Sequence, residues 1–376
     1  MSQFALFHPY YRKIGLTILV LWLLAFGLGS TSLITNTSLS RNLTPHIGDS
    51  CTIFTITRGN KVFFGNNEDY RLWGIYLWFV PAQTIWTPSS SHSTYGAVFF
   101  GFDNNDDDLV DGYPQGGMND QGLCMDGNGL SMYSLNPHPE RDSVYCSLMA
   151  QVLWECATVE DVVTWFQNHQ LGTQMNYQLH YADATGDAVV ISAGPNQELA
   201  FTRIGANPCL VSANINVADP ARDVYDCWRY STAITMLLSI SSESTLTPHA
   251  CRDILDAVHQ DGTYATKYSN VFDCVTRDIH LWYDRDYTNG ITLNLDAELA
   301  AVQPGSSGYT EALSLYHAFA DDGNLSYRKL PITDFFNSQP PPLAIYLIVA
   351  AGGIIITSVI ITSAVLLYRR RKAKLA

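Results

Sequence analysis

Cys51 and Asp69 are the two residues of this chain whose types and spacing first suggest chemistry. Cys51 opens an apolar, β-branched run, Arg58-Gly59-Asn60 reads as a tight polar turn, and a second apolar run returns to Asp69. The two ends of an antiparallel hairpin lie side by side, so the thiol and the carboxylate are expected to be spatial neighbours. A buried hairpin alone needs neither residue at that place.

A cut directly before Cys51 would give this thiol its own base. A free α-amine titrates near pH ~8, close enough to neutrality to take the thiol proton. Asp69 would then hold and orient that amine. The same spacing also suits a half-buried cysteine in an ordinary hairpin, and Cys51 alone does not decide between these interpretations. The decision depends on the rest of the chain.

Two long apolar stretches lie at the ends of the sequence. The first, 14–28, follows two basic residues and runs into small residues, as a signal peptide does, although an uncleaved anchor has the same layout. The second, 343–368, is uncharged, long enough to span a bilayer, and followed by a basic cluster that stays inside. The predicted organisation is a signal peptide or signal anchor at 1–32, a propeptide at 33–50, one domain at 51–330, a linker at 331–342, a transmembrane helix at 343–368 and a basic cytoplasmic tail at 369–376.

The region between residues 51 and 342 is strongly acidic. It holds 13 Lys and Arg against 34 Asp and Glu, a net charge of −21. Such a surface repels nucleic acid and anionic lipid, so we expect no nucleic-acid partner. About 290 residues suffice for one layered domain. We therefore expect a single-pass protein of the cell membrane whose large domain is extracellular.

The cysteines and acidic residues give no sign of a metal centre. Apart from Cys51 there are seven cysteines, so at least one of them is free or pairs with another chain. None has zinc spacing, and export makes disulfides plausible without fixing their pairing. The acidic stretch 103–108 lacks the glycine and the closing glutamate of an EF-hand loop. We predict a solvated loop there, with loose divalent-ion binding as the alternative, and we expect no metal centre and no cofactor.

The apolar pattern predicts strands and helices in separate blocks. Strands are expected at 73–80, 95–102, 177–183, 188–192, 199–203, 209–213, 271–276 and 279–284, and helices at 143–157, 158–166, 227–240 and 247–258. Blocks of strands with paired helices suit a layered α+β domain in which two sheets lie between helices.

Acyl transfer from an amide also needs hydrogen-bond donors aimed at the oxygen that becomes negative. Asn214 follows an apolar strand and could donate its amide, and Arg229 lies near the start of a helix. Each has an ordinary alternative, since asparagine is common in turns and arginine on surfaces.

The order of these residues resembles one known family. The landmarks are Cys51, the box Gly65-Asn66-Asn67-Glu68-Asp69, the box Gly117-Met118-Asn119-Asp120-Gln121-Gly122-Leu123, Asn214 and Arg229. They are similar to those of the choloylglycine hydrolase and penicillin V acylase family and of the related acyl-coenzyme A:6-aminopenicillanic acid acyltransferase group. These proteins are N-terminal nucleophile hydrolases, so the resemblance implies a four-layer αββα fold and a catalytic thiol exposed by autocatalytic cleavage.

The resemblance also implies roles for individual residues. Asp69 would position the α-amine, Asn214 and a polar group after the second box would line the oxyanion hole, and Arg229 would steady charge near the thiolate. Asn128 is the nearest match for that polar group. Asn66 departs from the pattern, because choloylglycine hydrolases usually carry an arginine there.

The substrate is expected to meet Asn66 and Trp78. Loss of a cation at Asn66 removes a contact for an acidic substrate, and aromatic residues around Trp78 could shape an apolar acyl pocket. Together with the acidic charge, this favours neutral or cationic amides with an apolar acyl chain.

The sequence thus predicts an enzyme that cleaves the linear carbon–nitrogen amide bond of a small N-acyl substrate through a Cys51 thioester. A cysteine N-terminal nucleophile dipeptidase and an acyltransferase are the enzyme alternatives. An inactive surface binding protein on the same scaffold is the alternative of another class. The acyl and amine parts of the substrate, and whether the chain forms a homo-oligomer, stay open.

Overall fold

The computed structural model describes residues 51–71, 75–86, 91–102, 113–144, 147–221, 227–302 and 328–331. The predicted segments at 1–32, 33–50 and 343–368, and the acidic stretch 103–108, lie outside these ranges. Within them, no helix is long and apolar enough to cross a membrane.

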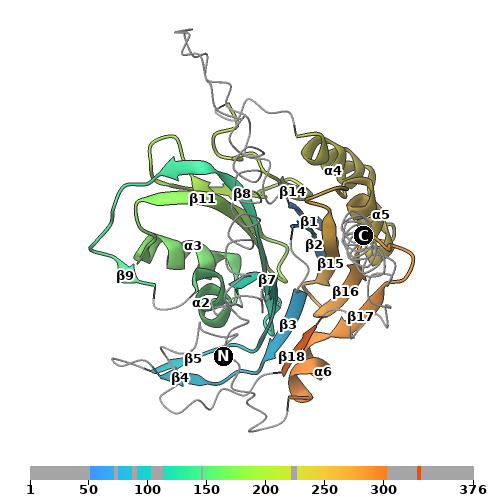
Figure 1. Cartoon of the computed structure of the whole chain (residues 1–376), viewed down its shortest axis with the longest axis horizontal. Coiled ribbons are helices and arrows are strands. Elements are labelled where there is room, and N and C mark those ends of the chain that lie inside the picture. Colours follow the sequence, from blue (N-terminus) through green and yellow to red (C-terminus); the bar gives the residue numbers. More distant parts are fainter. Residues whose placement is uncertain are drawn as a thin grey trace, which may run out of the picture. The chain divides into compact units, whose positions relative to one another are not determined.

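Two antiparallel sheets form the centre of the domain (Figure 1). The first has the order β14 (Cys209–Ser212), β1 (Thr52–Arg58), β2 (Lys61–Asp69), β15 (Thr266–Asp273), β16 (Asp278–Tyr283) and β17 (Ile291–Asn294). The second has the order β13 (Leu199–Arg203), β12 (Ala188–Ala193), β11 (Gln174–Ala182), β8 (Cys124–Ser134), β7 (Tyr113–Asn119), β6 (Ala97–Phe102), β3 (Ile75–Val80) and β18 (Arg328–Pro331). Two short pairs, β4 (Thr84–Trp86) with β5 (Ser91–Ser93) and β9 (Asp142–Ser143) with β10 (His169–Gln170), complete the described strands.

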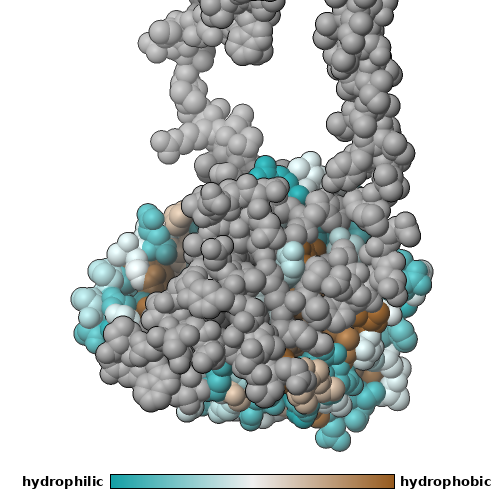
Figure 2. Space-filling model, turned by 60° about the horizontal axis from the view of Figure 1, so that its bottom comes forward, coloured by the Kyte–Doolittle hydropathy of each residue, from teal (hydrophilic) through white to brown (hydrophobic). Residues whose placement is uncertain are grey.

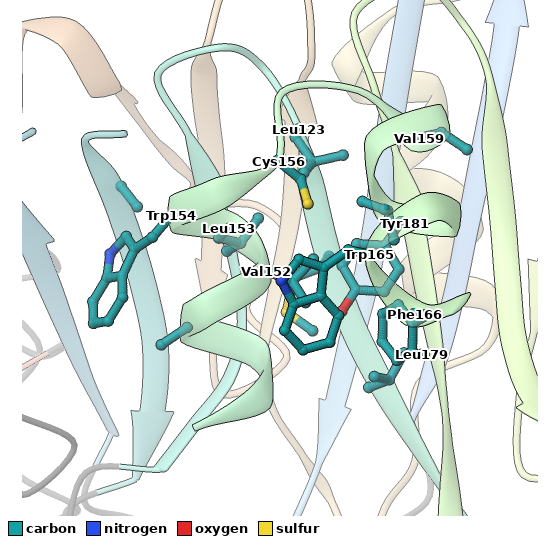
Figure 3. Packing of buried hydrophobic residues seen from close by; sticks show 14 of the residues in the cluster. Leu123, Val152, Leu153, Trp154, Cys156, Val159, Trp165, Phe166, Leu179 and Tyr181 are labelled. Carbon is teal, nitrogen blue, oxygen red and sulfur yellow. The ribbon is translucent and has the colours of Figure 1, made fainter. Parts of the chain in front are cut away.

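Helices cover the outer face of each sheet. The helices are α2 (Leu148–Glu155), α3 (Val159–Asn168), α4 (Trp228–Ser239), α5 (Pro248–Ala257) and α6 (Leu295–Ala300). Helices α2 and α3 pack on the eight-stranded sheet, where Trp154 and Phe166 bury their rings (Figure 3). Helices α4 and α5 pack on the six-stranded sheet through residues such as Leu237 and Ile254.

A third apolar cluster fills the space between the two sheets. Phe64 of β2 stacks on Phe272 of β15, and the ring of Phe100 on β6 approaches Phe272 edge-on from the facing sheet. The described part of the chain therefore has the predicted α+β architecture with four layers, αββα. Hydrophilic residues cover most of the coloured surface in Figure 2, with hydrophobic residues in small separate areas.

The hairpin that carries Cys51 is confirmed. Thr52 lies opposite Asn67 and Arg58 opposite Lys61, so only Gly59 and Asn60 form the loop. Gly59 has a φ of 59°, a left-handed conformation that glycine adopts without a Cβ clash. The register places Cys51 beside Glu68 and Asp69.

The predicted starts of two helices are also confirmed. Thr158 and Asp161 form a reciprocal capping box before α3, and Thr247 accepts a hydrogen bond from the Ala250 amide at the start of α5. The predicted helix at 143–157 is shorter, because 142–143 form strand β9 and α2 begins at Leu148.

Strands β7 and β8 have no counterpart among the predicted elements. In β8, Asp126 and Asn128 are buried polar residues with Gly127 between them, which hides the strand from an apolar pattern. Strand β15 begins at Thr266 rather than at 271 for the same reason, because its first half contains buried polar side chains.

Seven of the eight cysteines lie in the described ranges, and all seven are free thiols. The closest pair is Cys124 and Cys274, whose sulfur atoms are 3.5 Å apart between the sheets. Cys146 lies outside the described residues.

Candidate active site

Cys51 lies buried at the start of β1, where three layers of the fold meet. Its backbone carbonyl accepts a hydrogen bond from Asn128 Nδ2 at 3.1 Å and another from Arg229 Nη1 at 3.0 Å. Asn128 belongs to β8 in the facing sheet, and Arg229 to the first turn of α4. The structure thus brings residues 77 and 178 positions away in sequence to the predicted nucleophile.

Arg229 connects the predicted site residues to one another. Its Nη1 also donates to Thr52 Oγ1 at 2.8 Å and lies 3.4 Å from Asp69 Oδ2, and its Nη2 donates to Asn214 Oδ1 at 2.7 Å. The side chain is 2% exposed. The alternative of a solvated surface arginine is therefore wrong, and the planar guanidinium fork is used for positioning.

Asp69 sits in a closed ring of donors on the side of β2 that faces α4 and α5. Thr266 Oγ1 hydrogen-bonds to its Oδ1, and Gln260 Nε2 donates to its Oδ2 at 2.8 Å. Burial raises the pKa of Asp69 to about 7, although the charge of Arg229 and the two hydrogen bonds act to lower it. The carboxyl group is thus held in place beside Cys51. A cation that approaches it would favour its ionised, carboxylate form.

Asn214 lies in the loop after β14. Its Nδ2 donates to Gly129 O at 2.9 Å, and its Oδ1 accepts from Arg229. Gln178 of β11 holds the same loop, since its Nε2 donates to Ala213 O at 2.6 Å and to Ile215 O at 2.9 Å. The amide of Asn214 is consequently fixed with respect to β8 and α4.

The surroundings of the Cys51 thiol disfavour the thiolate. Burial raises its pKa well above the ordinary value, and the carboxyl groups of Glu68, Asp69 and Asp126 raise it further. A hydrogen bond from the backbone amide of Asp69 opposes this rise. A nucleophilic role for this thiol would therefore require a base that takes its proton.

The two predicted substrate contacts lie in different places. Asn66 is fully buried in the space between the sheets, on the same strand as Asp69. Trp78 is buried on the face of β3 that is covered by α2 and α3, beside Tyr76. The structure brings Asn66 to the neighbourhood of Cys51 and does not bring Trp78 there.

Several polar residues of the site were not found from the sequence. They are Gln178, Gln260, Thr266, Glu68 and Asp126, and none belongs to a local motif of its own apart from Glu68, which stands inside the first box. The available signal was a polar residue at an inward-facing strand position, as Gln178 is within the predicted strand 177–183. Among the described residues no group of three or more His, Cys, Asp or Glu could hold a metal ion.

Solved structures of known proteins share this fold. The chain is similar to penicillin V acylase from Agrobacterium tumefaciens, with a TM-score of 0.52 and 16% identity over 66% of this chain and 87% of that one. It is also similar to a mutant of the conjugated bile acid hydrolase from Clostridium perfringens, with a TM-score of 0.50 and 14% identity over 66% and 93% of the two chains.

A second variant of that hydrolase matches equally well, with a TM-score of 0.50 and 15% identity. No protein-family model and no curated protein matches the chain. The fold is similar to that of penicillin V acylase and of conjugated bile acid hydrolase, and the resemblance seen in the sequence is confirmed at the level of the fold.

Proposed function

We propose that the chain is an amidohydrolase that cleaves a linear carbon–nitrogen amide bond through Cys51, once the peptide bond before Cys51 has been broken. The observation that carries the proposal is the meeting of Asn128, Arg229 and Asp69 at Cys51, with Asn214 bound to Arg229. The similarity in fold to an acylase and to a hydrolase of conjugated bile acids supports the same reaction type.

The α-amine freed at Cys51 would take the proton of its own thiol. The sulfur then bonds to the carbonyl carbon of the substrate, and the carbonyl oxygen becomes negative. Asn128, whose amide donates to the Cys51 carbonyl, and Asn214, whose amide donates to the neighbouring Gly129 O, are the candidate donors to this oxygen. Asp69 and Arg229 fix the α-amine and the backbone of Cys51 in position.

Collapse of the tetrahedral intermediate breaks the carbon–nitrogen bond. The α-ammonium returns its proton to the departing nitrogen, so the amine leaves neutral and Cys51 holds the acyl group as a thioester. Water then attacks the thioester carbonyl carbon and loses a proton to the α-amine. The carbon–sulfur bond breaks, the carboxylic acid leaves, and the α-ammonium returns its proton to the Cys51 sulfur. An amine in place of water would give acyl transfer by the same steps.

The sequence further supports a location for this enzyme. We propose that residues 343–368 tether it to the cell membrane with the amidase domain outside. Fractionation of cells that express a chain without 343–376 tests this: the domain should leave the membrane fraction, and retention there would contradict the proposal.

The proposed reaction is tested by following a panel of N-acyl amides, penicillin V and a glycine-conjugated bile acid with the purified processed protein. Mass spectrometry of a quenched reaction should show one acyl group on Cys51, and alkylation of Cys51 should stop release of the amine. Cys209→Ser is the matched control, because Cys209 is the half-buried thiol among the described ones and lies outside the site. Turnover that survives alkylation of Cys51 would contradict the proposal.

A further inference from the structure

Two polar residues of β2, Asn66 and Glu68, face away from the hydrogen-bond network that surrounds Asp69. Alternation along the strand directs Asn67 and Asp69 to the layer of α4 and α5, as shown by the hydrogen bond from Asn67 Nδ2 to Leu255 O at 2.8 Å. Phe64 points the opposite way, into the core between the sheets. Asn66 and Glu68 follow Phe64 at steps of two and therefore also face this inter-sheet space.

The neighbouring strand β15 repeats the pattern. Asn270 lies directly opposite Asn66, and Tyr268 lies directly opposite Glu68. The stacked rings of Phe64 and Phe272 close the apolar side of this group. The apolar inter-sheet core thus changes into a polar cluster toward the end of β2 that lies next to Cys51.

A second carboxyl group enters from the facing sheet. Asp126 of β8 is two residues before Asn128 and shares its face of the strand, and Asn128 reaches the Cys51 carbonyl. Asp126 is 1% exposed, and no ion pair joins it to a cation among the described residues. Burial raises the pKa of Asp126 well above the ordinary value, and the charge of Glu68 raises it further. Two buried carboxyl groups from two sheets are therefore close neighbours beside the thiol.

The amides and the phenol of the cluster have hydrogen-bonding capacity left over. Both side-chain polar atoms of Asn66 and Asn270, and the hydroxyl of Tyr268, have no hydrogen-bond partner within the described ranges. All three side chains are buried, with at most 1% exposed. Glu68, Asp126 and Cys51 all act on the phenol, since their charges raise the pKa of Tyr268 beyond the effect of burial. Buried polar atoms in proteins are normally paired, so these point to a polar ligand.

We propose that the cluster of Asn66, Glu68, Asp126, Tyr268 and Asn270 binds the ammonium group of the substrate. The preferred substrates are then amides whose acyl part carries a primary ammonium close to the carbonyl carbon, that is, α-aminoacyl amides and dipeptides. This inference rests on the proposed function, because it places the acyl part beside the Cys51 sulfur. An ammonium offers three donors, and the cluster offers carboxylate, amide and phenol oxygens to accept them.

The position of the arginine in the site agrees with this charge selection. Arg229 is on the other face of β2, bound to Asp69 and Asn214. An acyl part with a carboxylate would meet Glu68 and Asp126 and be repelled. A neutral acyl chain would bring no positive charge to these two carboxyl groups.

Two anilides that differ only in the ammonium test the inference. They are L-leucine 4-nitroanilide and 4-methylpentanoic acid 4-nitroanilide, used with the processed protein purified from the full-length chain. We expect kcat/KM to favour the leucine compound by about 10- to 100-fold, the worth of one charge-assisted hydrogen bond. Equal values, or a preference for the neutral compound, overturn the inference and leave the cluster as a counter-ion for the α-amine of the chain itself.

Variants assign the preference to the cluster. Glu68→Gln and Asp126→Asn should each bring the ratio of the two kcat/KM values toward one while the neutral anilide is still cleaved. Asp183→Asn is the matched control: this carboxylate is also buried, but it accepts hydrogen bonds from Val159 N at the start of α3 and from Thr185 Oγ1 in the turn before β12, so the ratio should not change. A preference that persists in both cluster variants overturns the inference.

A binding measurement separates this inference from the proposed function. Calorimetric titration with 3-methylbutylamine, against 3-methylbutanol as the neutral match, reports on the cluster without any bond cleavage. Binding of the amine alone, without turnover of either anilide, supports the ammonium site and counts against the amidase reaction on these leaving groups. Turnover of the neutral anilide without binding of the amine supports the amidase and overturns the ammonium site. Failure of the amine to bind overturns the inference whatever the turnover.

Discussion

The two faces of β2 differ in how completely their polar groups are paired. On the face toward α4 and α5, Asn67 is held by Leu255 O and by Ser269 Oγ at 2.6 Å, and Asp69 by Thr266, Gln260 and Arg229. On the face toward the second sheet, Asn66 has both amide atoms without a partner among the described residues. Four consecutive residues thus serve two purposes: one face holds the catalytic group rigid, and the other is shaped for a ligand.

The difference follows from burial and charge. A buried carboxylate such as Asp69 is tolerated when a cation and donors surround it, and a hydrogen-bonded network of this kind loses much when one member is removed. Buried groups without partners cost stability in the free protein and are kept where a ligand repays them. Substitutions on the two faces should therefore have different consequences.

The largest effect is expected for Asp69→Asn. The amide keeps the size of the carboxyl group but cannot hold a charged α-amine, so we expect kcat to fall by about 10²- to 10⁴-fold, the usual contribution of a general base. Steady-state kinetics with a neutral amide measure this. A loss below about tenfold would mean that Asp69 only supports the fold.

A smaller loss is expected for Arg229→Lys. A single ammonium cannot reach both Asn214 and the Cys51 carbonyl as the guanidinium does, so we expect kcat/KM to fall by about 10- to 100-fold. Arg203→Lys is the control, because Arg203 binds Glu160 and Asp187 at the surface and such pairs contribute little. Equal activity in the two variants would remove Arg229 from the site.

Stability compares the two faces of β2 directly. Asn67→Ala should lower the free energy of unfolding by about 1–3 kcal/mol, because it removes the buried hydrogen bonds with Leu255 O and Ser269 Oγ, for which Tyr287 OH is then the side-chain partner. Asn66→Ala breaks no hydrogen bond that the described residues show and should cost less. Denaturant unfolding of both variants gives the difference, and a larger loss for Asn66→Ala would reverse the assignment of the faces.

The smallest effect concerns His180. This residue is buried between the two sheets, and both of its ring nitrogens have hydrogen-bond partners. Its ring nitrogens lie 3.0 Å from Thr55 Oγ1 and from Ser212 Oγ. Burial lowers the pKa of His180 to about 3, below the value of about 6.5 in an unfolded chain. The unfolded chain then binds more protons between these values, so the stabilising contribution is complete above pH 6.5 and is lost as the pH falls toward 3.

The slope of stability against pH isolates this histidine. His180 should contribute up to ~1.4 kcal/mol per pH unit in that window, so His180→Gln should flatten the slope by that amount between pH 6 and pH 5. The comparison with the wild type cancels the opposite contribution of Asp69, whose raised pKa makes the folded chain bind more protons. An unchanged slope would show that His180 is not held neutral.

Local signals explain which parts of the fold were predictable. The tight turn at Gly59, the capping box of Thr158 and the proline at the start of α5 depend on neighbouring residues, and the structure shows each of them. Strands β7 and β8 depend instead on partners far away in sequence, and their buried polar residues disguise the strand pattern.

The residues of the candidate site also fall into two groups, those that sequence motifs identify and those that only strand pairing brings to the site. Cys51, Asp69 and Arg229 could be found because they stand in ordered motifs, whereas Asp126 and Gln178 reach the site only through the pairing of β8 with β11. Trp78 shows a further limit: both faces of β3 are buried, so the sequence could not tell which face meets the site.

The N-terminus of the mature protein tests the central claim most directly. Intact-mass analysis of the purified protein should show a chain that begins at Cys51, and Cys51→Ala should keep the preceding residues and lack activity, because only a free α-amine on Cys51 gives the thiol a local base. An active protein that retains the peptide bond between Ser50 and Cys51 would contradict the account.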